Sequence, residues 1–206
     1  MILIGQYDSP FVRRVGMALT LYGMAFDHRP LSVFGDGGAV QALNPLMRVP
    51  VLVLEDGTVL SDSHMMLDYL DGQVADPMFP RAEPARHRAL RVAALACGLA
   101  DKAVSLFYER RLHSVTSPAW EARCQSQIRA TAQVLEAERA ALPGPWWFGD
   151  ALGHADIALA CAMRFAADAH PGLLDPAALP HLFDQSARLE SLPALIGIYQ
   201  PFAAPN

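Results

Sequence analysis

The chain has 206 residues, of which 52% are hydrophobic and 18% are charged, and its formal net charge is −5. This length suits one large domain or two small ones, and the apolar content excludes a disordered chain. The negative charge argues against nucleic acid as the main partner. No apolar run is long enough to cross a bilayer, and the first residues lack a signal-peptide pattern. Three widely spaced cysteines, Cys97, Cys124 and Cys161, indicate reduced thiols and a cytoplasmic location.

The first part of the chain has the pattern of a strand–helix–strand unit. Residues 1–7 are a short apolar run typical of a buried strand. Ser9 and Pro10 then predict a helix over about 11–22, with serine as N-cap and proline in the first turn. A second strand is expected over 26–33, before a glycine-rich loop and a weak helix.

A hairpin and a helix follow. The segment 48–54 enters a strand through Pro50, and the turn 55–58 leads to a short second strand. The pair Asp62-Ser63 then begins a helix that ends near Gly72. The expected order is strand, helix, strand, helix, strand, strand, helix.

The pattern changes from residue 76 onward. Prolines crowd the segment 76–84, which is typical of a linker between domains. No convincing strand follows, and prolines separate helices that are predicted over 84–112, 118–141, 154–169, 180–191 and 193–200. The expected division is a domain over 1–75, a linker over 76–84 and an all-helical domain over 85–206.

The hairpin and the Asp-Ser helix start carry a family resemblance. With Arg48-Val49-Pro50 before the hairpin and Asp62-Ser63 after it, the chain resembles the glutathione transferase superfamily. The resemblance covers essentially the whole chain. It implies a thioredoxin-like α/β domain followed by an all-helical C-terminal domain, with glutathione as co-substrate.

The resemblance also implies how glutathione would be held. A cis peptide bond before Pro50 would turn the backbone of Val49 toward the cysteinyl part of glutathione. Ser63 would donate to the γ-glutamyl carboxylate, Asp62 would pair with the ammonium, and Arg48 would reach the glycine carboxylate. The alternatives are an ordinary trans proline, plain helix capping and a solvated arginine. Asp62 departs from the family, which more often has Glu or Gln there, and its side chain is one methylene shorter than theirs.

The start of the first helix bears on chemistry. Ser9 stands where cysteine-type classes of the family have Cys, and Tyr7 is the rival residue for activating the thiol of glutathione. Lowering a thiol pKa by about 2 units from about 8.5 requires roughly 2.7 kcal/mol. A hydrogen bond to a charged group supplies about 1.5–3 kcal/mol and a helix N-terminus about 0.3–1 kcal/mol, so one hydroxyl suffices without a metal. The alternatives are that Ser9 only caps the helix and that Tyr7 belongs to the core. No cysteine lies in residues 1–96, so thiol–disulfide exchange through the protein is not expected.

The second substrate would be a small apolar electrophile. The resemblance implies a pocket between the first-helix loop and the helical domain, and the residues expected to line it are Phe11, Val104, Phe107, Tyr108 and Arg111. The alternative is that most of the four helical-domain residues are ordinary bundle core.

Another motif concerns the fold. The stretch from Gly149 to Asp156 resembles the family's helix-capping motif, with Gly153 in place of the usual capping hydroxyl. The seven histidines show no metal-ligand spacing, so no metal is expected.

The leading hypothesis is a detoxifying glutathione transferase that forms a homodimer. The alternatives are a non-catalytic or regulatory protein with the same fold, and a glutathione-dependent peroxidase or isomerase.

Overall fold

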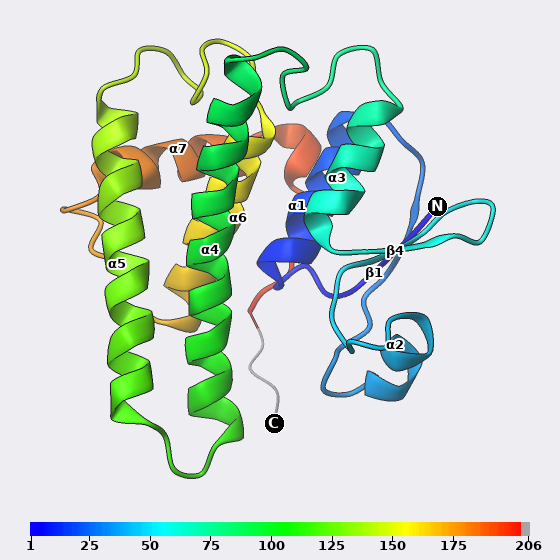
Figure 1. Cartoon of the computed structure of the whole chain (residues 1–206), viewed down its shortest axis with the longest axis horizontal. Helices are drawn as coiled ribbons and strands as arrows, with labels where there is room; N and C mark the ends of the chain where they lie inside the picture. The colour runs from blue at the N-terminus through cyan, green and yellow to red at the C-terminus, as the bar shows by residue number, and fades with distance from the viewer. Residues whose placement is uncertain (203–206) are drawn as a thin grey trace. The chain divides into compact units, whose positions relative to one another are not determined.

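The computed structural model describes residues 1–202 (Figure 1). The chain packs into two compact units: one contains Met1–Met78 together with the segment from Leu192, and the other is Phe79–Ser191. The helical domain expected over 85–206 ends in four residues, 203–206, that lie outside the described part of the chain. The segment from Leu192 groups with the first unit, which the expected domain limits did not provide for.

The first unit is thioredoxin-like. Its elements are β1 (Ile2–Ile4), α1 (Pro10–Leu21), β2 (Asp27–Arg29), α2 (Gly37–Leu43), β3 (Val51–Val53), β4 (Val59–Ser61) and α3 (Ser63–Gly72). The sheet order is β2-β1-β3-β4, with β1 parallel to β2 and antiparallel to β3, and with β3 antiparallel to β4. The element order expected from the sequence is confirmed. Two strands are shorter than expected. β1 ends before Gly5, whose φ is positive, and β2 ends before Pro30, which has no N–H group to donate.

The core of this unit lies between the sheet and its helices. Val12, Val15 and Leu19 of α1 are fully buried, as are Met66 and Leu70 of α3. These positions recur at helical spacing, so each helix turns one apolar face inward.

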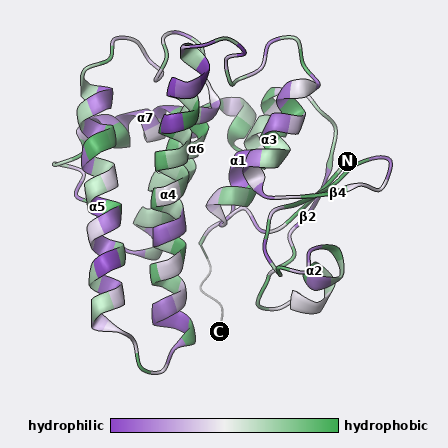
Figure 2. Ribbon diagram, viewed as in Figure 1, coloured by the Kyte–Doolittle hydropathy of each residue, from purple (hydrophilic) through white to green (hydrophobic). Residues whose placement is uncertain are grey.

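The second unit is a helical bundle. Its helices are α4 (Ala85–Leu112), α5 (Pro118–Ala140), α6 (His154–Ala169) and α7 (Pro180–Glu190). In Figure 2 purple and green alternate along α5, because one face of that helix is buried. These four helices match the expected ones to within a residue.

The fifth expected helix, over 193–200, is wrong. Only a 3-10 turn, η1 (Pro193–Leu195), forms there. Gly197 and Pro201 weaken a helix, and the carbonyl of Ile198 accepts a hydrogen bond of 2.8 Å from Arg13 Nε. The segment therefore runs as irregular chain against α1.

The expected capping motif at α6 is confirmed. Asp156 Oδ2 accepts from the Gly153 amide at 2.8 Å, and its Oδ1 accepts from the Trp147 amide at 2.8 Å. The carboxylate thus satisfies donors of the helix start and of the preceding loop. Its role is structural.

Candidate functional site

Ser9 stands at the start of α1. It is the N-cap, with φ −69° and ψ 124°, and its Oγ accepts from the Val12 amide at 3.4 Å. The expectation that Ser9 caps this helix is therefore confirmed. A hydroxyl that accepts a hydrogen bond still has its own proton to donate, so Ser9 remains able to donate to a thiolate at the positive end of the helix.

Tyr7 is packed differently. Its side chain is buried and its ring stacks on His28, with centroids 3.8 Å apart. Burial raises the pKa of Tyr7 to about 12. A Cβ at Gly16 would lie only 2.7 Å from Tyr7 Cε1, so the ring lies against the middle of α1. These contacts give Tyr7 a packing role that the sequence had left open.

The loop before β3 meets the first turn of α1. The peptide bond between Val49 and Pro50 is cis, as expected. Gly5 has φ +125°, and a Cβ there would lie 2.5 Å from Val12 Cγ2 and 2.8 Å from Val49 Cβ. Only glycine fits this close approach. The end of β1, the first turn of α1 and Val49 are therefore in direct contact.

A buried asparagine anchors the same loop. Asn44 Nδ2 donates to the Arg48 carbonyl at 2.8 Å, and Asn44 Oδ1 accepts from the Leu46 amide at 3.1 Å. The Arg48 side chain itself is exposed, which fits both a contact with the glycine carboxylate and a merely solvated arginine. Asn44 was not among the residues expected from the sequence, although an Asn before a proline in a loop is a recognisable signal for such backbone contacts.

The third part of the site is the start of α3. Asp62 is the N-cap, and its Oδ1 accepts from the His64 amide at 2.8 Å. Its φ of +73° is unusual for a residue with a side chain, and such conformations cluster at ligand sites. Ser63, the first residue of the helix, is 4% exposed. The expected carboxylate-binding pair thus stands at a helix N-terminus.

Arg14 joins α1 to this helix start. It is 1% exposed, and its Nη1 donates to Ser63 Oγ at 3.3 Å. Burial and the nearby Arg14 charge lower the pKa of His64. Arg14 was not among the residues expected from the sequence. The available signal was two adjacent arginines within an otherwise apolar helix, and both are buried, at 3% and 1% exposure.

The residues expected to line the electrophile pocket belong to both units. Phe11 is half-buried in the first turn of α1, in the first unit. Val104 and Phe107 are half-buried on α4, and Tyr108 and Arg111 are exposed there. Phe107 packs edge-on against Phe165 of α6, with centroids 6.5 Å apart, so part of this set belongs to the bundle core. The pocket itself stays a prediction.

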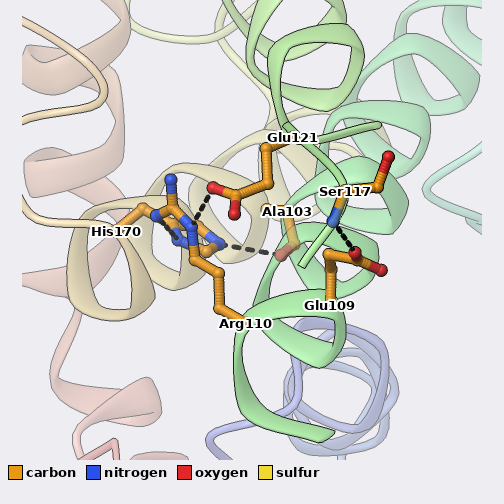
Figure 3. A network of polar contacts seen from close by, with 6 residues as sticks. All are labelled: Ala103, Glu109, Arg110, Ser117, Glu121 and His170. Carbon is orange, nitrogen blue, oxygen red and sulfur yellow. Dashed lines mark hydrogen bonds and ion pairs between the residues drawn. The ribbon is translucent and has the colours of Figure 1, made fainter. Parts of the chain in front are cut away.

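A polar network closes one end of the bundle (Figure 3). His170 Nε2 lies 2.8 Å from the Ala103 carbonyl, and Arg110 pairs with Glu121 at 2.7 Å. Glu109 accepts from the Ser117 amide at 2.6 Å. Burial is the main cause that lowers the pKa of His170. The network ties α4 to the start of α5 and to the residue after α6, and its role is structural.

Two further properties of the described residues concern other functions. Over residues 1–202, no helix is long and apolar enough to span a membrane. Within the same range, no cluster of His, Cys, Asp or Glu has the arrangement of a metal site.

A thioredoxin-like unit with a cis proline, followed by a helical bundle, defines a class of glutathione-binding folds. The chain matches the glutathione S-transferase N-terminal domain over residues 3–78 and the glutathione S-transferase C-terminal domain over residues 118–184. It belongs to the glutathione S-transferase family.

Similar proteins cover most of the chain. It is 34% identical over 168 residues to the uncharacterized GST-like protein YibF of Escherichia coli, covering 80% of this chain and 81% of that protein. It is 30% identical over 188 residues to a maleylacetoacetate isomerase of Pseudomonas aeruginosa, covering 83% and 86%. Among solved structures, a glutathione S-transferase of Methylobacterium radiotolerans in complex with glutathione sulfonate has a TM-score of 0.90 at 28% identity, with 100% of this chain and 96% of that chain covered.

Proposed function

We propose that the chain is a glutathione transferase that binds glutathione in its first unit and transfers its thiolate to a small apolar electrophile. The observation that carries the proposal is that one helix, α1, serves three parts of the site. Ser9 begins it, Val12 in its first turn lies against the cis-proline loop near Gly5, and Arg14 contacts Ser63. Family membership supports the same ligand.

Each part of glutathione has a partner in the proposed arrangement. The backbone of Val49 pairs with the cysteinyl part like an added strand. The γ-glutamyl carboxylate lies at the start of α3, where Ser63 and the helix N–H groups donate to it. Asp62 has its Oδ1 on the His64 amide, so its other carboxylate oxygen would meet the ammonium. Arg48 is exposed and would pair with the glycine carboxylate.

Ser9 is the proposed catalytic residue. Its hydroxyl donates to the thiolate while its oxygen caps α1, and the helix N-terminus adds favourable potential. The sulfur then forms a bond with an electrophilic carbon, and the leaving group departs with the bonding pair. Phe11 would lie on the electrophile side. The buried, stacked ring of Tyr7 favours Ser9 over Tyr7 for this role.

An isomerase is the second candidate, because the chain resembles a maleylacetoacetate isomerase over most of its length. In that reaction the thiolate would add to a cis carbon–carbon double bond, the resulting single bond would rotate, and elimination would return the thiolate with the trans product. The same thiolate site would serve, but glutathione would not be consumed. A binding protein without turnover is the third candidate.

Titration calorimetry with glutathione tests glutathione binding, which all three candidates share. Turnover with a chloro-nitroaromatic compound and with a maleyl-type cis-enedione then separates the candidates. Loss of glutathione in step with product supports a transferase, and cis–trans conversion at constant glutathione supports an isomerase. Binding without either reaction supports the third candidate, and absence of binding at millimolar glutathione refutes the proposal.

A further inference from the structure

We propose that the helical unit has a second ligand site, for a small molecule that carries both a carboxylate and an ammonium group, as a free amino acid does. The site is a cavity of about 290 Å³ between the end of α5, the loop that follows it and α7. In Figure 1 α7 lies beside the C-terminal end of α5. The cavity belongs to one compact unit and contains none of the residues proposed to hold glutathione. It is therefore independent of the proposed transferase site.

The size of the cavity limits its ligand. Ligand pockets commonly measure about 300–1,000 Å³, so this cavity is at the lower end of that range. A water molecule occupies about 30 Å³ in the liquid, so the cavity holds a ligand of roughly ten non-hydrogen atoms at most. A free amino acid has this size.

A buried positive charge lies at the wall of the cavity. Arg139 is 9% exposed and lines the cavity. Its Nη1 donates to the Leu142 carbonyl at 3.0 Å and its Nη2 to the Gly144 carbonyl at 2.6 Å, so the guanidinium is held in place. A guanidinium has five N–H groups, and only these two have an acceptor within residues 1–202. The others remain for a ligand.

The charge of Arg139 lacks a direct carboxylate partner in the described part of the chain. Asp156 is near enough for the two charges to interact, but its oxygens already accept from the amides of Trp147 and Gly153. A buried charge without a direct partner is unfavourable. A guanidinium also matches the planar fork of a carboxylate, so a ligand carboxylate is the favoured partner.

Two opposite charges of α7 line the same cavity. Asp184 and Arg188 lie one helical turn apart, and both are exposed. Residues four positions apart on a helix commonly pair, yet neither side chain has a hydrogen bond or an ion pair within residues 1–202. His181 also lines the cavity, but it is already paired with Glu136 at 2.6 Å. Asp184 and Arg188 are therefore available to a ligand that carries both signs of charge.

Gln185 adds a hydrogen-bond acceptor. It is 3% exposed, and its Nε2 donates to Asp156 Oδ1 at 2.5 Å, which turns the amide oxygen away from that carboxylate. This oxygen is buried and accepts no hydrogen bond within residues 1–202, which is unfavourable. A ligand ammonium beside Asp184 would supply the missing donor. The ligand carboxylate would then pair with Arg139 and Arg188.

Three small ligands test the site. L-alanine carries both charges, propionate lacks the ammonium group and ethylamine lacks the carboxylate. Each is titrated at equal ionic strength into the isotope-labelled full-length protein, and the NMR signals of the Gly144 and Gln185 amides report on the cavity. We expect L-alanine to shift both signals with a dissociation constant of about 1–10 mM, which suits so small a ligand. Propionate and ethylamine should each bind at least about threefold more weakly.

Two variants assign the charges. Asp184→Asn should weaken L-alanine binding about threefold to tenfold and leave propionate binding unchanged, whereas Arg188→Gln should weaken both ligands by a similar factor. Both side chains are exposed and without partners in residues 1–202, so the variants should fold. Arg123→Gln is the matched control, because it removes an exposed arginine of α5 that does not line the cavity. It should bind all three ligands as the wild type does.

Several results would overturn the proposal. One is that L-alanine at about 100 mM shifts neither signal, or binds no better than propionate and ethylamine. Another is that Arg123→Gln weakens L-alanine as much as Arg188→Gln does, because the effect would then be one of net charge alone. Signal changes confined to Ser9 and Ser63 would place L-alanine in the glutathione site and would also refute a second site. Arg188→Lys keeps the charge and should recover part of the binding that Arg188→Gln loses. The proposed transferase stands or falls on its own titration with glutathione.

Discussion

Replacing Ser9 tests two effects of one hydroxyl, the helix cap that the structure shows and the thiolate contact that we propose. Ser9→Ala removes the acceptor of the Val12 amide at the start of α1. At 3.4 Å this hydrogen bond is long, so we expect the free energy of unfolding to fall by about 0.5–1 kcal/mol, the lower part of the range for an N-cap. Loss of a donor to the thiolate should cost about 1.5–3 kcal/mol, which raises the pKa of bound glutathione by about 1–2 units.

Two further variants distinguish capping from thiolate stabilisation. Ser9→Asp keeps a good cap but has no proton to donate at neutral pH, and it brings a negative charge close to the sulfur. Stability should stay near that of the wild type while the thiol pKa rises at least as far as in Ser9→Ala. Tyr7→Phe keeps the ring on His28 and should leave the thiol pKa in place.

The assay is the thiolate absorbance of bound glutathione against pH, beside urea denaturation of the free protein. Turnover at neutral pH should fall in Ser9→Ala and recover in part as the pH rises. A thiol pKa that shifts in Tyr7→Phe and not in Ser9→Ala would make Tyr7 the activating residue. An unchanged pKa in all three variants would leave a backbone amide as the donor.

Three other predictions concern packing, pH and assembly. Gly16→Ala should lower the free energy of unfolding by about 1–3 kcal/mol, because its Cβ would lie 2.7 Å from Tyr7 Cε1. Gly98→Ala in α4, where the Cβ meets nothing within 4 Å, should instead stabilise by up to about 1 kcal/mol in the same denaturation experiment. Burial lowers the pKa of His170, so the unfolded chain takes up this proton more readily than the folded chain. The stability due to neutral His170 is complete above about pH 6.5 and is lost as the pH falls. His170→Gln should therefore narrow the difference in melting temperature between pH 7.5 and pH 5.5, and an unchanged difference would contradict this. Finally, we expect a homodimer that uses α3, where Met65 is 59% exposed, and a sedimentation mass near one chain at micromolar concentration would refute it.

Much of the fold could be predicted because its signals are local. A serine followed by a proline favours a helix start wherever it occurs. The structure has two such starts, with Ser9 before Pro10 and Ser117 before Pro118, and each serine is an N-cap. The order of the strands in the sheet could not be predicted from local signals, because no local pattern pairs β1 with both β2 and β3. The expected order came from the family resemblance alone.

Two of the failures involve contact between residues far apart in the sequence. The helix expected over 193–200 is weakened locally by Gly197, and the Ile198 carbonyl accepts a hydrogen bond from Arg13, 185 positions away. Arg14 likewise finds Ser63 49 positions away. Propensity scales describe neighbours along the chain and contain no information on such contacts.

The cap of α1 shows what local signals leave open. A serine followed by proline predicts the cap correctly, and the contact that we propose with glutathione would use the same hydroxyl. Sequence patterns therefore placed Ser9 but could not decide whether it only caps the helix.

The hydrogen bond from Arg13 to the Ile198 carbonyl makes the first unit a discontinuous domain. The chain leaves this unit after Met78, folds an entire helical bundle, and returns at Leu192 to complete the packing on α1. A fragment that stops at residue 78 would leave Gly16 without Ile198, whose Cγ2 would lie 3.1 Å from a Cβ on Gly16. During synthesis the thioredoxin-like unit therefore cannot reach its final packing until the segment from Leu192 has emerged from the ribosome.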